Sequence, residues 1–294
     1  MDTSVFGELS VVYYNDNDKD AVAWLKNLIS LGLLPQGEVD DRSITEVTVE
    51  DLRGFTQWHF FAGIGGWPLA LKLAGIPETW SVCTGSPCCQ PFSQAGKQRG
   101  KFDPRHLAPT YLRLVKQLKP EFMFGEQVAK AIESGWLDDM QNEMENAGYS
   151  FGASILNAAI LNAPHRRERL YFGAVSNVVN PYGNSGRVQI SGSDGKAQAT
   201  TLSNWQEVIK SWESVGAGED VLRVWEHTRQ YLCRDGKWRK LPEPGIPLLV
   251  DGLSTPMGLS RHKGFGNAIV PQIGALWVQE FMKSVDDCVR GEHG

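Results

Sequence analysis

The fold is decided by one stretch, Trp58-His59-Phe60-Phe61-Ala62-Gly63-Ile64-Gly65-Gly66. Its aromatic first half predicts a buried strand, and apolar residues over 69–73 predict a helix after the glycines. Glycines between a strand and a helix let the backbone approach a ligand and leave helix N–H groups pointing at that ligand. The alternative is a tight turn without a ligand, because short glycine motifs are often only turns. The stretch therefore predicts an α/β fold with a candidate ligand-binding turn.

Strands and helices alternate on both sides of this turn. Further strands are expected at 11–14, 43–49, 80–84, 122–124 and 170–175. Helices are expected, from the spacing of apolar residues, at 22–29, 107–118, 132–144 and 273–285. This alternation is typical of a mostly parallel α/β sheet.

The character of the chain changes after about Asn177. Residues 182–195 are rich in Gly, Ser and Asn, which indicates a loop or linker. The stretch that follows has several tryptophans and a less regular pattern, and Asp235-Gly236 predicts a hairpin there. We expect 177–250 to form a second, smaller unit. The first part of the chain, 1–176, would form the main domain, and the last part, 251–294, would complete that main domain.

Composition places the chain among ordinary globular proteins. Hydrophobic residues make up 41% and charged residues 21% of the 294 residues, which excludes a disordered chain. This length suggests about two domains, or one domain with an insertion. No apolar run is long enough to span a membrane, and the N-terminal residues lack the pattern of a signal peptide. We therefore expect a cytoplasmic protein without a membrane partner.

Charge and cysteine content narrow the class further. The net charge of −5 argues against a general nucleic-acid coat but leaves room for a local basic groove. The five cysteines are odd in number and contain no Cys-x-x-Cys pair, so a structural zinc site is not expected. Free cysteines of this kind indicate a reducing compartment.

Two of the cysteines lie in a stiff loop, Pro87-Cys88-Cys89-Gln90-Pro91, after the strand expected at 80–84. The prolines hold the side chains at fixed angles, at the sheet edge where open α/β proteins bind ligands. A thiol becomes a nucleophile there only if a positive group lowers its pKa from about 8.5. The alternative is a pair of buried structural cysteines.

Arginines and a single carboxylate lie beside two predicted strands. Arg167 and Arg169 come directly before the strand at 170–175, and in an extended chain both point to the same side. Their guanidinium groups can pair with carboxylate or phosphate. Glu126 follows the strand at 122–124, where burial would raise its pKa and let it transfer protons. The alternatives are a solvated basic turn and a carboxylate favoured by a helix dipole.

Together, these stretches resemble the motifs of the DNA (cytosine-5) methyltransferase family, in a phage or bacterial form. The resemblance implies a Rossmann-like methyltransferase sheet with a small target-recognition segment, 177–250. The matched positions are 61–66 for the S-adenosylmethionine motif, 89–93 for the nucleophile motif, Glu126 for Glu-Asn-Val, His165, Arg167 and Arg169 for Gln-x-Arg-x-Arg, and 266–271 for the last motif.

Three positions depart from the family pattern. Cys88 stands where the family has proline, so both neighbouring thiols are candidates for the nucleophile, and the Gln-Pro-Phe-Ser register favours Cys89. Gln127 replaces an asparagine, and His165 replaces a glutamine. Because the glutamate and both arginines are intact, activity is expected.

The spacing of the motifs is the largest departure. In the family, two strand–turn units between the glycine motif and the nucleophile supply acids for the ribose and the adenine of the cofactor. Here only 23 residues (89 − 66) separate the two motifs. Two similar units lie upstream, with Asp16 resembling the ribose acid and either Asp40 or Asp41 the adenine acid. We therefore expect a circularly permuted catalytic domain, which a chain tolerates when the cut lies in an exposed loop.

The resemblance implies methyl transfer from S-adenosylmethionine to carbon 5 of a cytosine flipped out of double-stranded DNA. Cys89 would attack carbon 6 of the ring, and Glu126 would hold ring N3 and the exocyclic amine. Arg167 would hold the base carbonyl, and Arg169 would support the loop and the nucleophile. The expected cofactor-binding residues are Phe61, Ala62, Gly63, Ile64, Gly65, Gly66, Asp16, Asp40, Asn267 and Ala268.

DNA contacts are expected in two basic stretches, the loop 94–101 after the nucleophile and the predicted hairpin, whose charge over 234–240 is +4 − 1 = +3. A mobile surface loop and a solvated hairpin are the alternatives. The protein is expected to act as a monomer and without a metal ion. The expected DNA-binding residues are Gln90, Ser93, Lys97, Arg99, Lys101, Arg234, Lys237 and Arg239.

Other functions compete with this interpretation. An adenine amino-methyltransferase would need an Asp/Asn-Pro-Pro-aromatic loop, and the chain has only Asn180-Pro181-Tyr182. An RNA cytosine-5 methyltransferase shares the chemistry, but the long segment between Arg169 and the last motif favours DNA. A catalytically inactive DNA-binding relative is the remaining alternative. A compact enzyme of this kind would suit a phage that masks its DNA, whereas a cognate nuclease would indicate restriction–modification.

Overall fold

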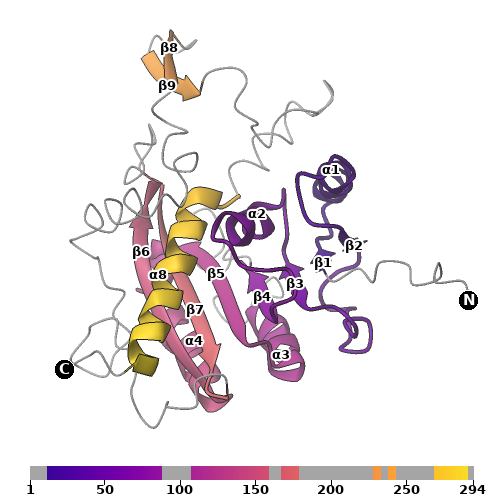
Figure 1. The fold of residues 1–294 in the computed structure, drawn as a ribbon, viewed down its shortest axis with the longest axis vertical. Coiled ribbons are helices and arrows are strands. Elements are labelled where there is room, and N and C mark those ends of the chain that lie inside the picture. Colours follow the sequence, from indigo (N-terminus) through magenta and orange to yellow (C-terminus); the bar gives the residue numbers. More distant parts are fainter. Residues whose placement is uncertain are drawn as a thin grey trace, which may run out of the picture.

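A computed structural model of the chain describes residues 12–87, 107–158, 167–178, 228–232, 238–242 and 268–290. The elements alternate between strand and helix as the sequence predicts (Figure 1). They are β1 (Val12–Asn15), α1 (Lys19–Ser30), β2 (Gly37–Asp40), β3 (Gln57–Phe60), α2 (Gly66–Leu73), β4 (Val82–Gly85), α3 (Ala108–Leu118), β5 (Phe122–Val128), the short 3₁₀ helix η3 (Ala129–Ala131), α4 (Trp136–Asn146), β6 (Tyr149–Asn157), β7 (Glu168–Ser176), β8 (Thr228–Leu232), β9 (Trp238–Pro242) and α8 (Pro271–Arg290).

One sheet of seven strands organises the molecule, in the order β2-β1-β3-β4-β5-β7-β6. The first five of these pair in parallel, and β7 runs antiparallel to both of its neighbours. The predicted mostly parallel α/β sheet is therefore confirmed. Strands β8 and β9 form a separate antiparallel pair in which Leu232 lies opposite Trp238. This pairing agrees with the predicted hairpin, whose turn, Asp235-Gly236, lies outside the described residues.

Helices cover both faces of the sheet because successive strand residues point to opposite sides. On one face, α3 and α4 pack on Trp58, Phe60 and Met123. On the other face, α2 and α8 pack on strands β4, β5 and β7, while α1 covers β1, the strand next to the edge strand β2. The result is a three-layer arrangement with the sheet in the middle.

The last helix lies beside the glycine-turn helix, although the two are distant in sequence (Figure 1). A Cβ on Gly274 of α8 would lie 3.0 Å from the Ala70 side chain of α2. Trp277 of α8 donates its indole N–H to the Phe172 carbonyl of β7 at 3.2 Å. The last helix therefore packs against both the glycine-turn helix and β7.

Two expectations about individual elements are wrong. Residues 43–49 form turns, because side-chain hydrogen bonds such as those from Thr48 to the Asp51 carboxylate hold the backbone locally. The second strand of the chain is instead β2. The helix expected from Ile132 begins only at Trp136, because Gly135 has a left-handed φ of 72° and breaks the run. Among the described residues, no helix is long and apolar enough to cross a bilayer.

Candidate active site at the carboxyl ends of the strands

The predicted site residues that the structure describes gather at one edge of the sheet. Parallel strands bring their carboxyl ends together, so the turns after β1, β2, β3 and β4 all open on this edge. Glu126 lies near the carboxyl end of β5. Because β7 is antiparallel, its first residues lie at the same edge, and Arg169 pairs with Val128 of β5.

Asp16 joins the end of β1 to the glycine turn. Its carboxylate accepts the Gly63 N–H at 2.8 Å and the Asp18 N–H at 2.9 Å. Beside it, the Asn15 carbonyl accepts the Ala62 N–H at 3.0 Å. Hydrogen bonds thus join the loop after β1 to the glycine turn after β3, although the two are distant in sequence. The predicted ribose-binding acid, Asp16, lies directly against the predicted cofactor turn.

The glycines of the turn have two different roles. A Cβ on Gly65 would overlap the Leu34 side chain, and one on Gly66 would lie 2.8 Å from Ile269. These two glycines therefore allow close packing of protein on protein. Among the described residues, a Cβ on Gly63 would meet only the Phe61 carbonyl oxygen, at 3.9 Å, so within this part of the chain Gly63 is the glycine of the turn with room beside it. The expectation that the glycines allow a ligand to approach applies to Gly63.

Alanine at Gly65 is expected to destabilise the fold more than alanine at Gly75, at the other end of α2. Both glycines have left-handed φ values, 82° and 78°, but no described residue has an atom within 4 Å of the missing Cβ of Gly75. Gly75→Ala should cost about 1–2 kcal/mol from backbone strain. Gly65→Ala should cost about 1–3 kcal/mol more, because its methyl group overlaps Leu34. Urea unfolding of both variants measures the difference, and equal losses would contradict the packing role of Gly65.

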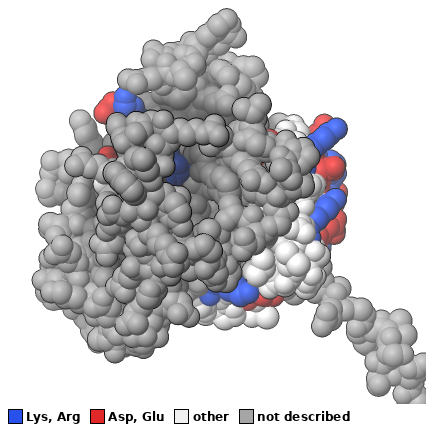
Figure 2. Space-filling model, turned by 90° about the horizontal axis from the view of Figure 1, so that it is seen from above, with Lys and Arg blue, Asp and Glu red and all other residues white. Residues whose placement is uncertain are grey.

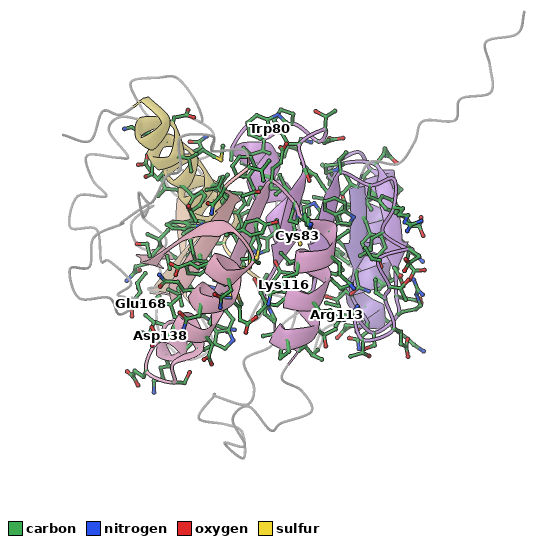
Figure 3. All side chains as sticks on the ribbon, turned by 90° about the horizontal axis from the view of Figure 1, so that it is seen from below. Trp80, Cys83, Arg113, Lys116, Asp138 and Glu168 are labelled. Atoms are coloured by element: carbon green, nitrogen blue, oxygen red, sulfur yellow. The ribbon has the colours of Figure 1, made fainter. Side chains whose placement is uncertain are left out.

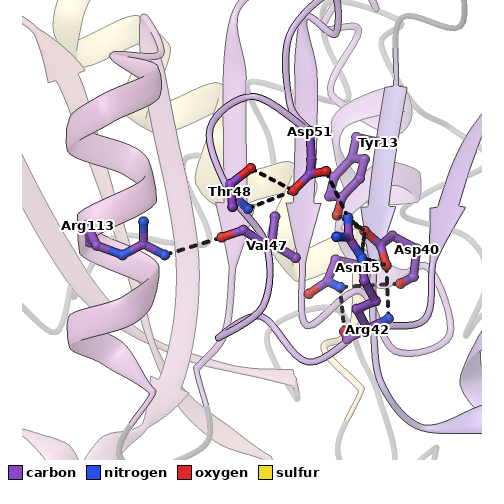
Figure 4. A network of polar contacts seen from close by, with 8 residues as sticks. All are labelled: Tyr13, Asn15, Asp40, Arg42, Val47, Thr48, Asp51 and Arg113. Carbon is purple, nitrogen blue, oxygen red and sulfur yellow. Dashed lines mark hydrogen bonds and ion pairs between the residues drawn. The ribbon is translucent and has the colours of Figure 1, made fainter.

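Asp40 is held in a network of polar contacts (Figure 4). Its carboxylate accepts four donors: the Tyr13 hydroxyl at 2.7 Å and the backbone N–H, Nε and Nη2 of Arg42 at 2.6–3.1 Å. Arg42 also pairs with Asp51 at 3.3 Å. A carboxylate has about four acceptor positions, so this set fills Asp40. The neighbouring Asp41 is exposed.

Asn15 ties the same network to β1. Its amide donates to the carbonyl of Asp40 at 3.3 Å and to that of Arg42 at 2.9 Å. Burial alone would raise the Asp40 pKa, but the hydrogen bonds from Arg42 and Tyr13 outweigh it and lower that pKa below its usual range. Asp40 is therefore an ionised residue that shapes the loop after β2.

Cys88 and Cys89, the two thiols predicted as candidates for the nucleophile, lie outside the described residues, whereas Cys83 is described and its environment does not suit a nucleophile. Cys83 of β4 is fully buried under α3, where burial raises its pKa to about 12 despite a hydrogen bond with Tyr111 (Figure 3). Such a thiol stays protonated and inert. Also outside the described residues are Gln90, Ser93, Lys97, Arg99, Lys101, His165, Arg234, Lys237 and Asn267, and for Arg239 the strand alone is described.

The entry to the nucleophile motif is described as far as Pro87. The Ser86 hydroxyl accepts the Glu126 N–H at 3.2 Å and the Trp67 indole N–H at 3.0 Å. Gln127 donates its side-chain amide to the Pro87 carbonyl at 3.0 Å. These contacts are not predictable from the motifs, although the departure of Gln127 from the family's asparagine is a signal for one of them.

Glu126 and Arg169 form the charged centre of the site. Arg169 Nε lies 2.8 Å from a Glu126 carboxylate oxygen, and the glutamate side chain is only 8% exposed. Burial raises the Glu126 pKa, and the positive charges of Arg169 and Arg167 offset part of that rise. Glu126 can therefore take up a proton more readily than an ordinary carboxylate, as the sequence analysis expected.

Arg167 reaches from the start of β7 to the last motif. Its Nη2 donates to the carbonyl of Ala268, a predicted cofactor-binding residue just before α8. Burial and the charge of Arg169 lower the Arg167 pKa, and Glu126 acts in the opposite direction. The electrostatic influence of both arginines on Glu126 agrees with the predicted common side of Arg167 and Arg169.

In the view of Figure 2, the described part of the surface has no large patch of positive or of negative side chains, because Lys and Arg lie among Asp and Glu. The positive charge that faces Glu126 comes instead from the half-buried Arg167 and Arg169. Among the described residues, no group of three or more His, Cys, Asp or Glu side chains could hold a metal ion.

Comparisons with known proteins agree with this arrangement. The family model for C-5 cytosine-specific DNA methylase matches residues 72–213. The type II methyltransferase M.HhaI of Haemophilus parahaemolyticus is 30% identical over 183 residues, which are 49% of this chain and 53% of that protein. The tRNA (cytosine(38)-C(5))-methyltransferase of Schizosaccharomyces pombe is 26% identical over 192 residues, or 63% and 57% of the two chains.

A solved structure supports the fold. The chain resembles the Entamoeba histolytica methyltransferase EhMeth with a TM-score of 0.50 and 14% identity, over 96% of this chain and 99% of that one. The sheet and its charged edge thus define an α/β fold of the methyltransferase kind. Over residues 72–213 the chain is similar to the C-5 cytosine-specific DNA methylase family. It spans slightly more than half the length of the first two curated relatives, 53% and 57%.

Proposed function

We propose that the chain transfers a methyl group from S-adenosylmethionine to carbon 5 of a flipped-out cytosine in double-stranded DNA, through a covalent adduct with Cys89. One observation carries the proposal: the ion pair of the buried Glu126 with the half-buried Arg169 lies beside the entry to the nucleophile motif. A cytosine ring needs both a nucleophile at carbon 6 and a proton donor at N3 before carbon 5 becomes reactive.

Glu126 suits the second of these tasks. Its raised pKa favours a protonated carboxyl, which can donate to ring N3 and so neutralise the charge that develops when the thiol adds. Arg167 holds the base carbonyl in this proposal, and Arg169 keeps Glu126 oriented through their ion pair. Loss of the carbon 5 proton and release of the thiol then restore the aromatic ring.

The cofactor fits the turns on the other side of the edge. S-adenosylmethionine supplies the methyl group when it is bound. The described residues leave room beside the missing Cβ of Gly63, and Asp16 lies next to this glycine. Because Asp40 is filled by Arg42 and Tyr13, the exposed Asp41 is the better acid for the adenine.

The strand order supports a circular permutation. A Rossmann sheet is ordered 3-2-1-4-5 when its strands are counted from the glycine-turn strand. In this chain the glycine turn follows β3, and β1 and β2 occupy the places of the second and third strands. The units with Asp16 and Asp41 thus lie where a family member would have them, although they come first in sequence.

Asparagine at Asp41 is expected to raise the Kd for S-adenosylmethionine about tenfold, because an adenine amine would lose a charged acceptor. Stability should not change, since Asp41 is exposed. Asp40→Asn should instead lower the free energy of unfolding. Isothermal titration and thermal unfolding separate the two effects, and weaker binding with Asp40→Asn alone would identify Asp40 as the adenine acid.

The Asp40 effect has a predicted pH dependence. A lowered folded-state pKa stabilises the fold above the unfolded-state pKa of about 3.9, and this stabilisation is lost as the pH falls through the folded-state value. The loss caused by Asp40→Asn should therefore be full at neutral pH and shrink below about pH 4.

Base-resolution mapping of 5-methylcytosine tests the proposal, after expression in a bacterium that lacks cytosine methylation. A single methylated DNA context would support DNA as the substrate and residues 177–250 as the target-recognition segment. The match to a tRNA methyltransferase favours RNA as the second candidate, so RNA from the same cells is mapped in parallel. Methylation of RNA alone would overturn the DNA proposal, and no methylation of either would favour an inactive relative.

A further inference from the structure

The chain enters its nucleophile motif through Ser86 and Pro87, and β5 holds this entry from the side. Thr84 is the last residue of β4 that pairs with β5 in the sheet. Beyond it, hydrogen bonds that involve side chains continue the connection: Ser86 Oγ accepts the Glu126 N–H, and Gln127 Nε2 donates to the Pro87 carbonyl. The backbone that leads to Cys88 and Cys89 is therefore tied to the strand that carries the acid.

Gln127 uses both ends of its side chain. It is 4% exposed. Its Nε2 donates to Pro87 at 3.0 Å, while its Oε1 accepts the Val128 N–H at 3.1 Å. A flipped amide would bring two oxygens together at Pro87, so one orientation satisfies both contacts. The side chain thus has a fixed direction and gives a buried carbonyl its hydrogen-bond donor.

Ser86 connects the same point to the glycine-turn helix. Its hydroxyl oxygen accepts from Glu126 and from the Trp67 indole, so one atom joins α2, the end of β4 and β5. Trp67 is the second residue of α2, directly after the glycine turn. The proposed cofactor turn, nucleophile entry and acid therefore share one hydrogen-bonded junction.

We infer that Gln127, together with Ser86, is a positioning residue that fixes the direction in which the chain leaves β4 toward the nucleophile, relative to Glu126. This inference rests on the proposed function and deepens it. It also gives a physical role to the departure from the family's asparagine, because a glutamine is one methylene longer and here spans the distance to the Pro87 carbonyl.

A second buried glutamine provides a matched control. Gln57 is 2% exposed and donates its Nε2 to the Pro77 carbonyl at 3.0 Å. It is the first residue of β3, at the end of the strand away from the glycine turn. Residue type, burial, acceptor and distance are thus the same as for Gln127, and only the place in the fold differs. A merely structural glutamine predicts the same behaviour at both positions.

The experiment compares Gln127→Met with Gln57→Met in the full chain. Methionine keeps the length of the side chain and removes its hydrogen bonds. Gln127→Met should lower kcat about 10- to 100-fold, the range expected when a buried carbonyl loses its donor at a catalytic loop. Its KM for S-adenosylmethionine should not change, because the glycine turn is intact. Gln57→Met should lose similar stability and keep kcat, and equal kcat values for the two variants would overturn the inference.

Gln127→Glu gives a second measurement, the pH dependence of kcat, for which the inference predicts a direction. At high pH a carboxylate would face the Pro87 carbonyl without a proton to donate. As the pH falls, a protonated carboxyl can donate to that carbonyl as the amide does. The ratio of variant to wild-type kcat should therefore rise from about pH 8 to about pH 6, because burial raises the pKa of a glutamate at this position. A ratio independent of pH would count against the inference.

A thiol-labelling measurement is independent of methyl transfer. Alkylation of Cys89, followed by mass spectrometry without DNA or cofactor, should change several-fold in rate for Gln127→Met and for Ser86→Ala, but not for Gln57→Met. If the wild-type chain methylates nothing, the proposed function fails and this comparison still decides the inference. Unchanged labelling in both Gln127→Met and Ser86→Ala would overturn it.

Discussion

Alanine at Cys89 is expected to abolish methyl transfer, with kcat lowered at least about 10⁴-fold. The reason is that addition of the thiol to carbon 6 is the step that makes carbon 5 reactive. Alanine at Cys88 should leave activity within about a few-fold of wild type. The structure supports the contrast in one respect: Cys83, the third thiol of this region, is buried with a pKa of about 12 and cannot replace a missing nucleophile.

Covalent trapping measures the difference directly. DNA that contains 5-fluorocytosine at the target site keeps the adduct, since the carbon 5 position then has no proton to lose. Wild type and Cys88→Ala should form the trapped complex, and Cys89→Ala should not. The opposite result, with trapping lost only in Cys88→Ala, would show that the Gln-Pro-Phe-Ser register is the wrong guide and that the thiol next to Pro87 attacks.

The sequence predicted the parts of the fold whose signals are local. In β3, the glycine turn and α2, the period of the apolar residues changes from strand to helix at the glycines, and no distant contact is needed to recognise it. Strand β6 was missed, because Gly152, Ala153 and Ser154 have low strand propensity. Pairing with β7 along its whole length makes these residues extended, which is a tertiary effect.

The same distinction applies to the site. The edge at which it lies follows from parallel strands, and so the places of Asp16 and the glycine turn could be predicted. The ion pair of Glu126 with Arg169 could not, because it depends on the antiparallel register in which Arg169 lies opposite Val128. The filling of Asp40 could be predicted only in part: Arg42 is two residues away along the chain, whereas the Tyr13 hydroxyl comes from the neighbouring strand β1, which no spacing in the sequence encodes.

Glutamine at Glu126 is expected to lower kcat about 10²- to 10⁴-fold, because an amide keeps the shape of the side chain but cannot give a proton to ring N3. A matched control is Glu143→Gln. Glu143 is an exposed residue of α4 that pairs with Lys116 of α3, and its replacement should leave kcat unchanged. Comparable losses in the two variants would contradict a role for Glu126 in the reaction.

The role of Glu126 as a proton donor also predicts the direction in which kcat changes with pH. A group that must be protonated supports activity below its pKa, so wild-type kcat should fall as the pH rises through the raised Glu126 value. Replacing Arg169 by methionine removes a positive charge that lowers the Glu126 pKa, so the alkaline fall of kcat should move to higher pH in Arg169→Met, in addition to any overall loss. In Glu126→Gln that fall should disappear. A fall that stays at the same pH in all three proteins would belong to another group, and Glu126 would then act through its hydrogen bonds alone.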